Sequence, residues 1–164
     1  MIEIIGLVPE NEDALYTLAE ANMTKERPDL AIGYSARLLI ALIAKPKPET
    51  VSDADWDSKK SSLTGRGNYI AGVASCLREL WQDCDRFLRA AMPIVSSQPG
   101  LVGPINFYLG LSNYRIGLST DNRQRIQDGA KFMKESASLA GPMQDQAKLN
   151  VTAIEKDLTS KRGR

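Results

Sequence analysis

Cysteine and histidine carry much of the metal-binding and nucleophilic chemistry of proteins, and this 164-residue chain uses them sparingly. It contains two cysteines, Cys76 and Cys84, and no histidine. A zinc site with four cysteine or histidine ligands is therefore excluded, and so is a histidine general base. If the two cysteines lie in separate antiparallel helices, a disulfide is geometrically allowed, but their spacing does not require one. We expect two reduced, small apolar core residues.

The other residue types that support catalysis do not form a recognisable site. The sequence shows no paired acids at an informative spacing, no glycine-rich phosphate loop and no nucleophile beside a base. We therefore expect a protein that is not an enzyme and that needs no metal and no cofactor. A helical enzyme using carboxylate, lysine or cysteine chemistry is the alternative.

Charge and hydropathy restrict the partners. Lysine and arginine number 21 and acidic residues 20, a net charge of +1, and there is no long basic stripe, so we predict no nucleic-acid binding. The longest apolar run, residues 38–44, is far shorter than the roughly 20 residues of a membrane-spanning helix, so no membrane insertion is expected. Residues 1–9 do not resemble a secretory signal. A cytoplasmic location is expected, unless the chain is a fragment of a longer protein with its own signal or anchor.

Apolar residues recur every three or four positions along most of the chain, which predicts an all-α fold. Pro28, tolerated in a first helical turn, separates the first two helices. The polar segment 45–68 contains two prolines and predicts a linker, within which Trp56 could anchor one or two helical turns. The expected helices are 15–23, 30–42, 69–80, 82–95, 105–116, 121–139 and 143–158. They form one domain, 1–160, with antiparallel hairpins at 10–45, 65–99 and 103–142, a capping helix at 143–158 and a tail at 161–164.

Small residues recur in a pattern that relates the three hairpins. Each first helix has one near its middle, each second helix has one near its start, and a further residue follows seven positions later. The three sets are Ala19, Ala31 and Leu38; Gly72, Cys84 and Ala91; and Gly110, Ala130 and Ala137. The first interval is 12, 12 and 20 residues, so the third hairpin is predicted to contain eight extra residues. We interpret these, residues 121–128, as two added helical turns, with a solvated loop as the alternative.

The segment YLGLSNYRIG, residues 108–117, resembles the first helix of a tetratricopeptide repeat (TPR). The matching residues are Leu109, Gly110, Tyr114 and Gly117, with Ala130, Ala137 and Pro142 in the second helix. Cys84 replaces an alanine in the second hairpin, and the first hairpin is the weakest match. The resemblance implies an α-α superhelix, a TPR-like solenoid, whose first helices line a concave groove. Generic helical hairpins or a bundle are the alternative.

Transferring the groove of that family to this chain selects residues three or four apart on each first helix. They are Tyr16, Glu20 and Met23 in the first hairpin, Arg66, Tyr69, Val73 and Cys76 in the second, and Phe107, Leu111, Tyr114 and Arg115 in the third. Tyrosine and arginine contribute strongly at interfaces, and an acidic or C-terminal peptide would suit Arg66 and Arg115. Alternatively, the apolar and aromatic members pack between neighbouring hairpins.

The resemblance implies a scaffold that binds a peptide or helix of a partner protein. Chaperone-binding members of the family hold a terminal carboxylate with lysine and asparagine. Asp13, Tyr16 and Glu20 lie at the corresponding positions, so that clamp is absent. The alternative function is a self-association or regulatory domain, which would make the chain a homo-oligomer or part of a larger complex.

Overall fold

The computed structural model describes residues 11–160, and this part of the chain forms seven α-helices and no strand. The helices are α2 (Glu12–Thr24), α3 (Pro28–Ala44), α4 (Asp53–Leu77), α5 (Trp81–Val95), α6 (Pro99–Ser119), α7 (Arg123–Ser138) and α8 (Gln144–Ser160). The all-α prediction is confirmed, and none of the described helices is long and apolar enough to cross a membrane. The predictions for residues 1–10 and for the tail at 161–164 lie outside the described residues.

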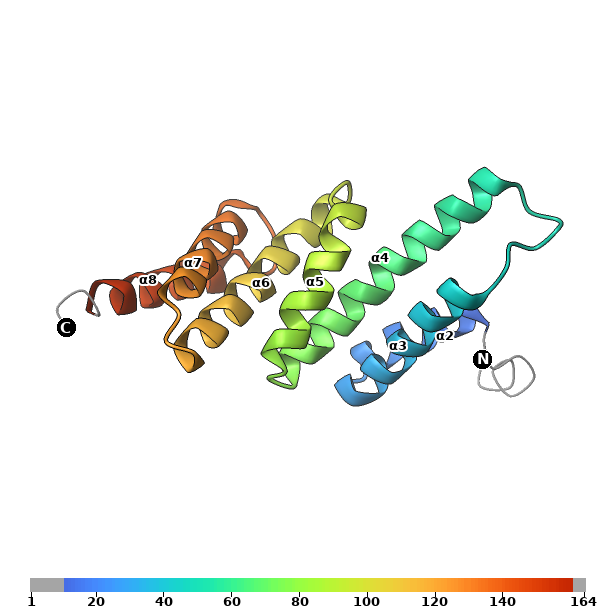
Figure 1. Ribbon diagram of the computed structural model, residues 1–164. Helices are drawn as coiled ribbons and strands as arrows, with labels where there is room; N and C mark the ends of the chain where they lie inside the picture. Colours follow the sequence, from blue (N-terminus) through green and yellow to red (C-terminus); the bar gives the residue numbers. More distant parts are fainter. Residues whose placement is uncertain (1–10, 161–164) are drawn as a thin grey trace.

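The helices pack in chain order from one end of the molecule to the other (Figure 1). Three antiparallel hairpins, α2–α3, α4–α5 and α6–α7, are followed by α8, which packs mainly on α7. The first helices also contact one another, α2 with α4, α4 with α6, and α6 with α8. Any groove between neighbouring first helices is therefore built from residues about 40–50 positions apart in the sequence.

All three hairpins turn through the same three-residue loop. Its middle residue is acidic and has a positive φ: 54° at Glu26, 59° at Glu79 and 48° at Asp121. In each loop the backbone N–H of the following residue donates to a carbonyl five residues earlier, at 2.8–2.9 Å. This bond closes the end of the first helix in the manner usual for glycine at this position. The shared loop sets a common register for the three hairpins.

That register corrects the alignment of the third hairpin. The fifth residue after the positive-φ residue is Ala31, Cys84 or Ile126, and the seventh before it is Ala19, Gly72 or Tyr114. The predicted alignment places Gly110 and Ala130 at the third-hairpin positions, each four residues away. Four residues are about one helical turn, so the misaligned residues lie on nearly the same face. The predicted eight-residue insertion is wrong, because the third loop is as short as the others.

Small residues allow α6 and α7 to approach closely. A Cβ atom on Gly129 would lie 2.8 Å from the Tyr114 backbone nitrogen and 2.9 Å from the Gly110 carbonyl oxygen. Helix α6 continues to Ser119, beyond the predicted end at residue 116, and a Cβ on Gly117 would lie 2.8 Å from the Ile126 nitrogen. Glycine therefore allows close packing in this hairpin, because Gly129 of α7 and Gly117 of α6 each lie against backbone atoms of the other helix.

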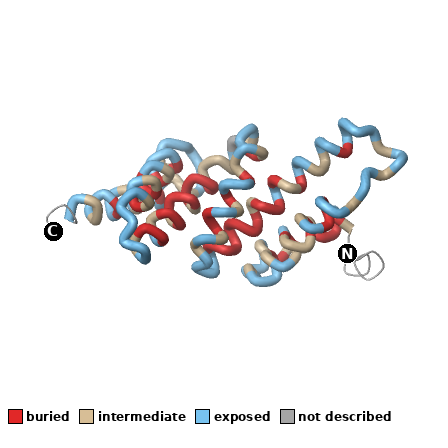
Figure 2. Tube along the Cα trace, in the orientation of Figure 1, coloured by how far each residue is buried: buried red, intermediate tan, exposed pale blue. Residues whose placement is uncertain are grey.

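Helix α4 begins earlier than predicted and has 25 residues. Ser52 caps it, because its Oγ accepts the Asp55 N–H at 3.1 Å and donates to the Asp55 carboxylate at 2.6 Å. The linker is therefore only residues 45–52. Most residues in the first turns of α4 are exposed (Figure 2), so this stretch is polar although it is helical. Trp56 is one of its few buried residues.

The expectation of two reduced cysteines is wrong, because Cys76 of α4 and Cys84 of α5 form a disulfide. They lie three residues before and five residues after Glu79, and the antiparallel hairpin brings their Cα atoms to 5.1 Å. Both are buried in a core cluster with Leu88, Leu109 and other apolar residues. The predicted cytoplasmic location stays a prediction, and the disulfide argues against it, since such bonds persist mainly in oxidising compartments.

A buried ionic cluster joins the first hairpin to the start of α4. The Glu12 carboxylate is almost fully buried, and it accepts hydrogen bonds from Lys45 and, at 3.1 Å, from Lys59. Lys59 also pairs with Asp13 at 2.6 Å. Burial alone would raise the pKa of Glu12, but the two lysines outweigh it and lower that pKa. Glu12 is therefore held ionised between α2, the end of α3 and α4.

A second polar cluster joins the second and third hairpins and was not predicted. The buried Asp85 carboxylate accepts hydrogen bonds from Asn113 at 2.6 Å, Arg89 at 2.9 Å and Arg125 at 3.1 Å. Arg125 also donates to the Asn113 side-chain oxygen at 2.7 Å. Each member has hydrogen-bond partners, as buried polar groups require. The cluster fixes α5, α6 and α7 relative to one another.

Candidate functional site

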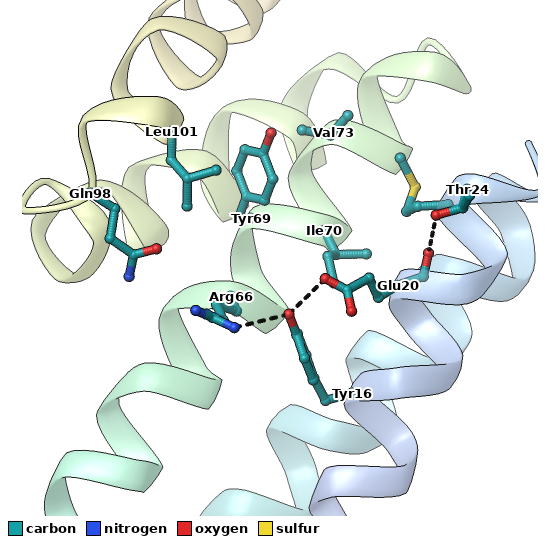
Figure 3. Close-up of a pocket in the computed structure, with 10 residues that line it drawn as sticks. Tyr16, Glu20, Thr24, Arg66, Tyr69, Ile70, Val73, Gln98 and Leu101 are labelled. Carbon is teal, nitrogen blue, oxygen red and sulfur yellow. Dashed lines mark hydrogen bonds between the residues drawn. The ribbon is translucent and has the colours of Figure 1, made fainter. Parts of the chain in front are cut away.

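A cavity of about 420 Å³ lies where α2, α4 and the start of α6 meet. We call it the groove. Its lining residues are Tyr16, Glu20, Met23, Thr24, Arg66, Tyr69, Ile70, Val73, Gln98 and Leu101 (Figure 3). Helices α2 and α4, the first helices of neighbouring hairpins, form its two long sides. Gln98 and Leu101, at the start of α6, form a third side. Most of these side chains are apolar or aromatic, and the charged ones are Glu20 and Arg66.

Tyr16 links the two charged residues of the groove. Its hydroxyl donates to the Glu20 carboxylate at 2.8 Å and accepts from the Arg66 guanidinium at 3.2 Å (Figure 3). The Arg66 guanidinium carbon also lies 5.8 Å from the centre of the Tyr16 ring. Burial and the hydrogen bond to Glu20 raise the pKa of Tyr16, so its hydroxyl stays protonated at neutral pH. Glu20 and Arg66 themselves are exposed at the edge of the groove.

The apolar part of the groove lies on the main core. Val73 is buried and belongs to the core cluster that contains both cysteines. Tyr69, Met23 and Leu101 are half-buried and pack against this cluster. Figure 3 shows Tyr69 between Leu101 and Val73. Burial raises the pKa of Tyr69, which therefore presents a neutral hydroxyl. The surface offers a partner apolar contact with a charged edge.

The structure brings together most of the residues predicted on the first two hairpins. Tyr16, Glu20 and Met23 line one side of the groove, and Arg66, Tyr69 and Val73 line the other. Cys76 is separate, because it is buried in the disulfide. Sequence reasoning missed Thr24, Ile70, Gln98 and Leu101. Thr24 and Ile70 each follow a predicted residue on the same helix, whereas Gln98 and Leu101 come from a segment whose turn residues hid the start of α6.

The four residues predicted on the third hairpin lie elsewhere. Phe107 is buried in the core between α6, α7 and α8. Leu111, Tyr114 and Arg115 line a separate cavity of about 100 Å³ against α8. By the loop register, Leu111 and Arg115 match Tyr16 and Glu20, whereas Phe107 and Tyr114 match the buried Glu12 and Ala19. The alignment error therefore selected Phe107, which is buried in the core, and Tyr114, whose side chain contacts α8.

Tyr114 contacts the capping helix. Its hydroxyl donates to the Asp157 carboxylate of α8. Burial and this hydrogen bond raise the pKa of Tyr114 to about 12. Arg115 is exposed, and its guanidinium carbon lies 5.7 Å from the centre of the Trp81 ring. Neither residue contributes to the groove.

Comparison with protein-family models, with curated proteins and with solved structures finds no match for the chain. Within residues 11–160, no group of three or more cysteine, aspartate or glutamate side chains is placed to hold a metal ion. The case for function therefore rests on the geometry of the groove.

Proposed function

We propose that this protein is an interaction scaffold whose groove holds a peptide or helix of a partner protein. The single observation that carries the proposal is the cavity between α2 and α4, with its apolar floor and its Glu20–Tyr16–Arg66 edge. An apolar side chain of the partner would enter between Tyr69 and Val73, and an acidic group would pair with Arg66. Aromatic and arginine side chains in a partly desolvated pocket are the groups that contribute most to binding.

We also propose that the hairpins form a TPR-like superhelix. Three observations support this proposal: the identical loops, the contacts between successive first helices, and the common register of Tyr16, Tyr69 and Leu111, each ten residues before the positive-φ residue. Stacked repeats of this kind use nearest-neighbour packing and an extended concave surface. The capping position of α8, with a largely exposed outer face, fits the end of such a stack.

Two arginines provide a matched test of the groove. Peptides would be selected against the wild-type protein from a displayed peptide library, and their dissociation constants measured by calorimetry. Arg66→Glu should weaken binding by about tenfold or more, because it reverses a charge inside the groove. Arg115→Glu reverses a charge that is also exposed but lies outside the groove, and it should leave binding within about twofold. The proposed site would be contradicted if the two variants changed the dissociation constants equally, or if neither variant changed them.

The outer surface of α3 supports self-association as a second candidate function. Ile40 is 63% exposed and Ile43 is 79% exposed, and Ile43 lines a cavity of about 270 Å³ with Leu39 and Phe87. Exposed apolar patches often mark protein interfaces. Sedimentation velocity over a wide concentration range should show association that Ile43→Lys abolishes and Leu149→Lys, at an exposed leucine of α8, does not. A monomer at every concentration would exclude this candidate.

A further inference from the structure

The disulfide lies directly behind the groove. Cys76 comes three residues after Val73 and seven after Tyr69, so the three residues lie on one face of α4. The two cysteines belong to the core cluster against which Tyr69, Met23 and Leu101 pack. The groove wall therefore rests on the part of α4 that is covalently joined to α5.

The surroundings of the disulfide leave it little freedom to rearrange. Cys84 is fully buried and Cys76 is only 4% exposed. Both sulfur atoms lie against α6, at 3.7 and 3.8 Å from the Tyr108 carbonyl oxygen. Gly72, one turn before Cys76, brings α4 close to Leu88 of α5, where a Cβ atom would lie 2.6 Å from Leu88 Cγ. Tight packing of this kind transmits a local change in spacing to its neighbours.

We propose that the Cys76–Cys84 bond couples the redox state of the surroundings to the shape of the groove. In the oxidised protein the bond fixes the wall formed by Tyr69 and Val73. A dithiol reductant breaks the bond in two exchange steps: its thiolate attacks one sulfur and forms a mixed disulfide, and its second thiol then displaces the other cysteine. Two cysteine thiols and one oxidised reductant result, with two electrons and two protons transferred. The wall then relaxes, and the groove loses its binding geometry.

Burial makes this response slow in the folded protein. A reductant reaches neither sulfur until the α4–α5 hairpin opens, so opening limits the reaction. We therefore expect dithiothreitol to reduce the native protein at least about 100-fold more slowly than the protein in 6 M guanidinium. Disulfides persist in oxidising compartments, so the fixed form of the groove is the one expected there.

Methionine methyl NMR tests the coupling without any ligand. Met23 lines the groove and, like Met92, packs against the cluster that contains the disulfide, whereas Met133 and Met143 belong to the cluster around α8. In protein labelled at the methionine methyls, full reduction should shift the Met23 and Met92 signals and leave Met143 in place. The double variant Cys76→Ala/Cys84→Ala should reproduce the reduced pattern and show no response to dithiothreitol.

Binding of a library-selected peptide provides the second measurement, which rests on the proposed function. Reduction should weaken that binding by about tenfold, and a saturating peptide should shift the equilibrium for reduction of the disulfide toward the oxidised form by the same factor, because the coupling is reciprocal. Failure of every peptide to bind would count against the proposed function alone, since the Met23 shift needs no ligand. An unchanged Met23 signal after complete reduction, or two free thiols in protein purified under air, would overturn the redox proposal.

Discussion

The cavity between α2 and α4 differs in size from the cavity between α6 and α8. Between α2 and α4, at the N-terminal end, lies the groove of about 420 Å³, whereas the cavity between α6 and α8 measures only about 100 Å³. Both places contain a tyrosine that donates to a carboxylate. Tyr16 donates to Glu20 on its own helix and leaves the space beside it open, but Tyr114 reaches across to Asp157 of α8 and closes the gap.

The difference arises because Tyr16 and Tyr114 lie at different distances along the chain from the positive-φ loop residue of their hairpins. Tyr16 lies ten residues before the loop residue Glu26, on the face that points toward the next hairpin, and its counterpart on α6 is Leu111. Tyr114 lies seven residues before Asp121, where the other hairpins have Ala19 and Gly72. A large side chain fits there because Gly129 supplies the small residue from α7 instead. Similar residue types therefore produce a groove at one end and a filled interface at the other.

Gly129→Ala should have the largest effect, because it acts on the backbone contact that makes room for Tyr114. The added Cβ would meet backbone atoms of α6 at 2.8 and 2.9 Å, which cannot move aside without separating the helices. We expect the free energy of unfolding to fall by about 2 kcal/mol, despite the better helix propensity of alanine. Urea unfolding monitored by circular dichroism measures it.

Gly33→Ala is the matched control for this prediction. Gly33 lies inside α3, and a Cβ there would meet nothing within 4 Å. Alanine should therefore stabilise the protein by up to about 1 kcal/mol through helix propensity alone. If both variants were stabilised, α6 and α7 would not be in backbone contact, and the explanation for the filled interface would fail.

Glu12→Gln should have the next largest effect and acts at the N-terminal end. Glutamine leaves Lys45 and Lys59 without their shared carboxylate, which should cost about 1–2 kcal/mol at pH 7. The folded-state pKa of Glu12 is lowered, so its stabilisation is present above the ordinary value of 4.5 and disappears as pH falls through the folded value. Thermal unfolding between pH 7 and pH 2 should show the difference between wild type and variant shrinking toward acid pH.

Glu135→Gln, at an exposed glutamate of α7, controls for the loss of one acidic side chain. We expect a change within about 0.5 kcal/mol and no pH-dependent difference. If Glu12→Gln behaved in the same way, the ionic cluster would contribute nothing to the free energy of unfolding. Packing alone would then fix α2 against α4.

Local patterns predicted what depends on neighbouring residues in the chain. Apolar spacing located all the hairpin helices, but it missed the first turns of α4, where solvent-facing polar residues give no periodic signal, and the start of α6, where turn residues hid the helix. Spacing of three and four also grouped Tyr16 with Glu20, and Tyr69 with Val73. It could not separate positions one helical turn apart, which is why Phe107 was selected as the counterpart of Tyr16, although the loop register pairs Tyr16 with Leu111. The disulfide, the Asp85 cluster and the contact with Asp157 depend on three-dimensional proximity, which no local pattern contains.

Tyr114→Phe tests the closed end directly. Loss of the hydrogen bond to Asp157 leaves a partly buried carboxylate with one partner fewer and should cost about 1 kcal/mol at neutral pH. The pKa of Tyr114 is about 12 in the folded protein, against an ordinary value of 10.0. Its stabilisation is therefore complete below pH 10 and is lost as pH rises toward 12.

The measurement is the urea midpoint at pH 9 to 12 for wild type, Tyr114→Phe and Tyr34→Phe, the last being a half-buried tyrosine of α3. The advantage of the wild type over Tyr114→Phe should disappear across this range, and Tyr34→Phe should follow the wild type. If the urea midpoint of the wild type stayed above that of Tyr114→Phe by the same amount up to pH 12, the stabilisation by the Tyr114 hydroxyl would not depend on its hydrogen bond to Asp157.

Tyr16→Phe should have the smallest effect on stability. Its hydroxyl bonds to Glu20 and Arg66, but both are exposed, and exposed polar contacts contribute little, so we expect a loss below about 0.5 kcal/mol. Arg66 loses one acceptor and gains freedom at the edge of the groove. A cost equal to that of Tyr114→Phe, measured by urea unfolding at pH 7, would mean that Tyr16 joins α2 to α4 as firmly as Tyr114 joins α6 to α8. The two ends of the molecule would then differ only in the size of their cavities. The edge of the groove would be fixed between α2 and α4, and Tyr16 and Arg66 would not be free to contact a partner.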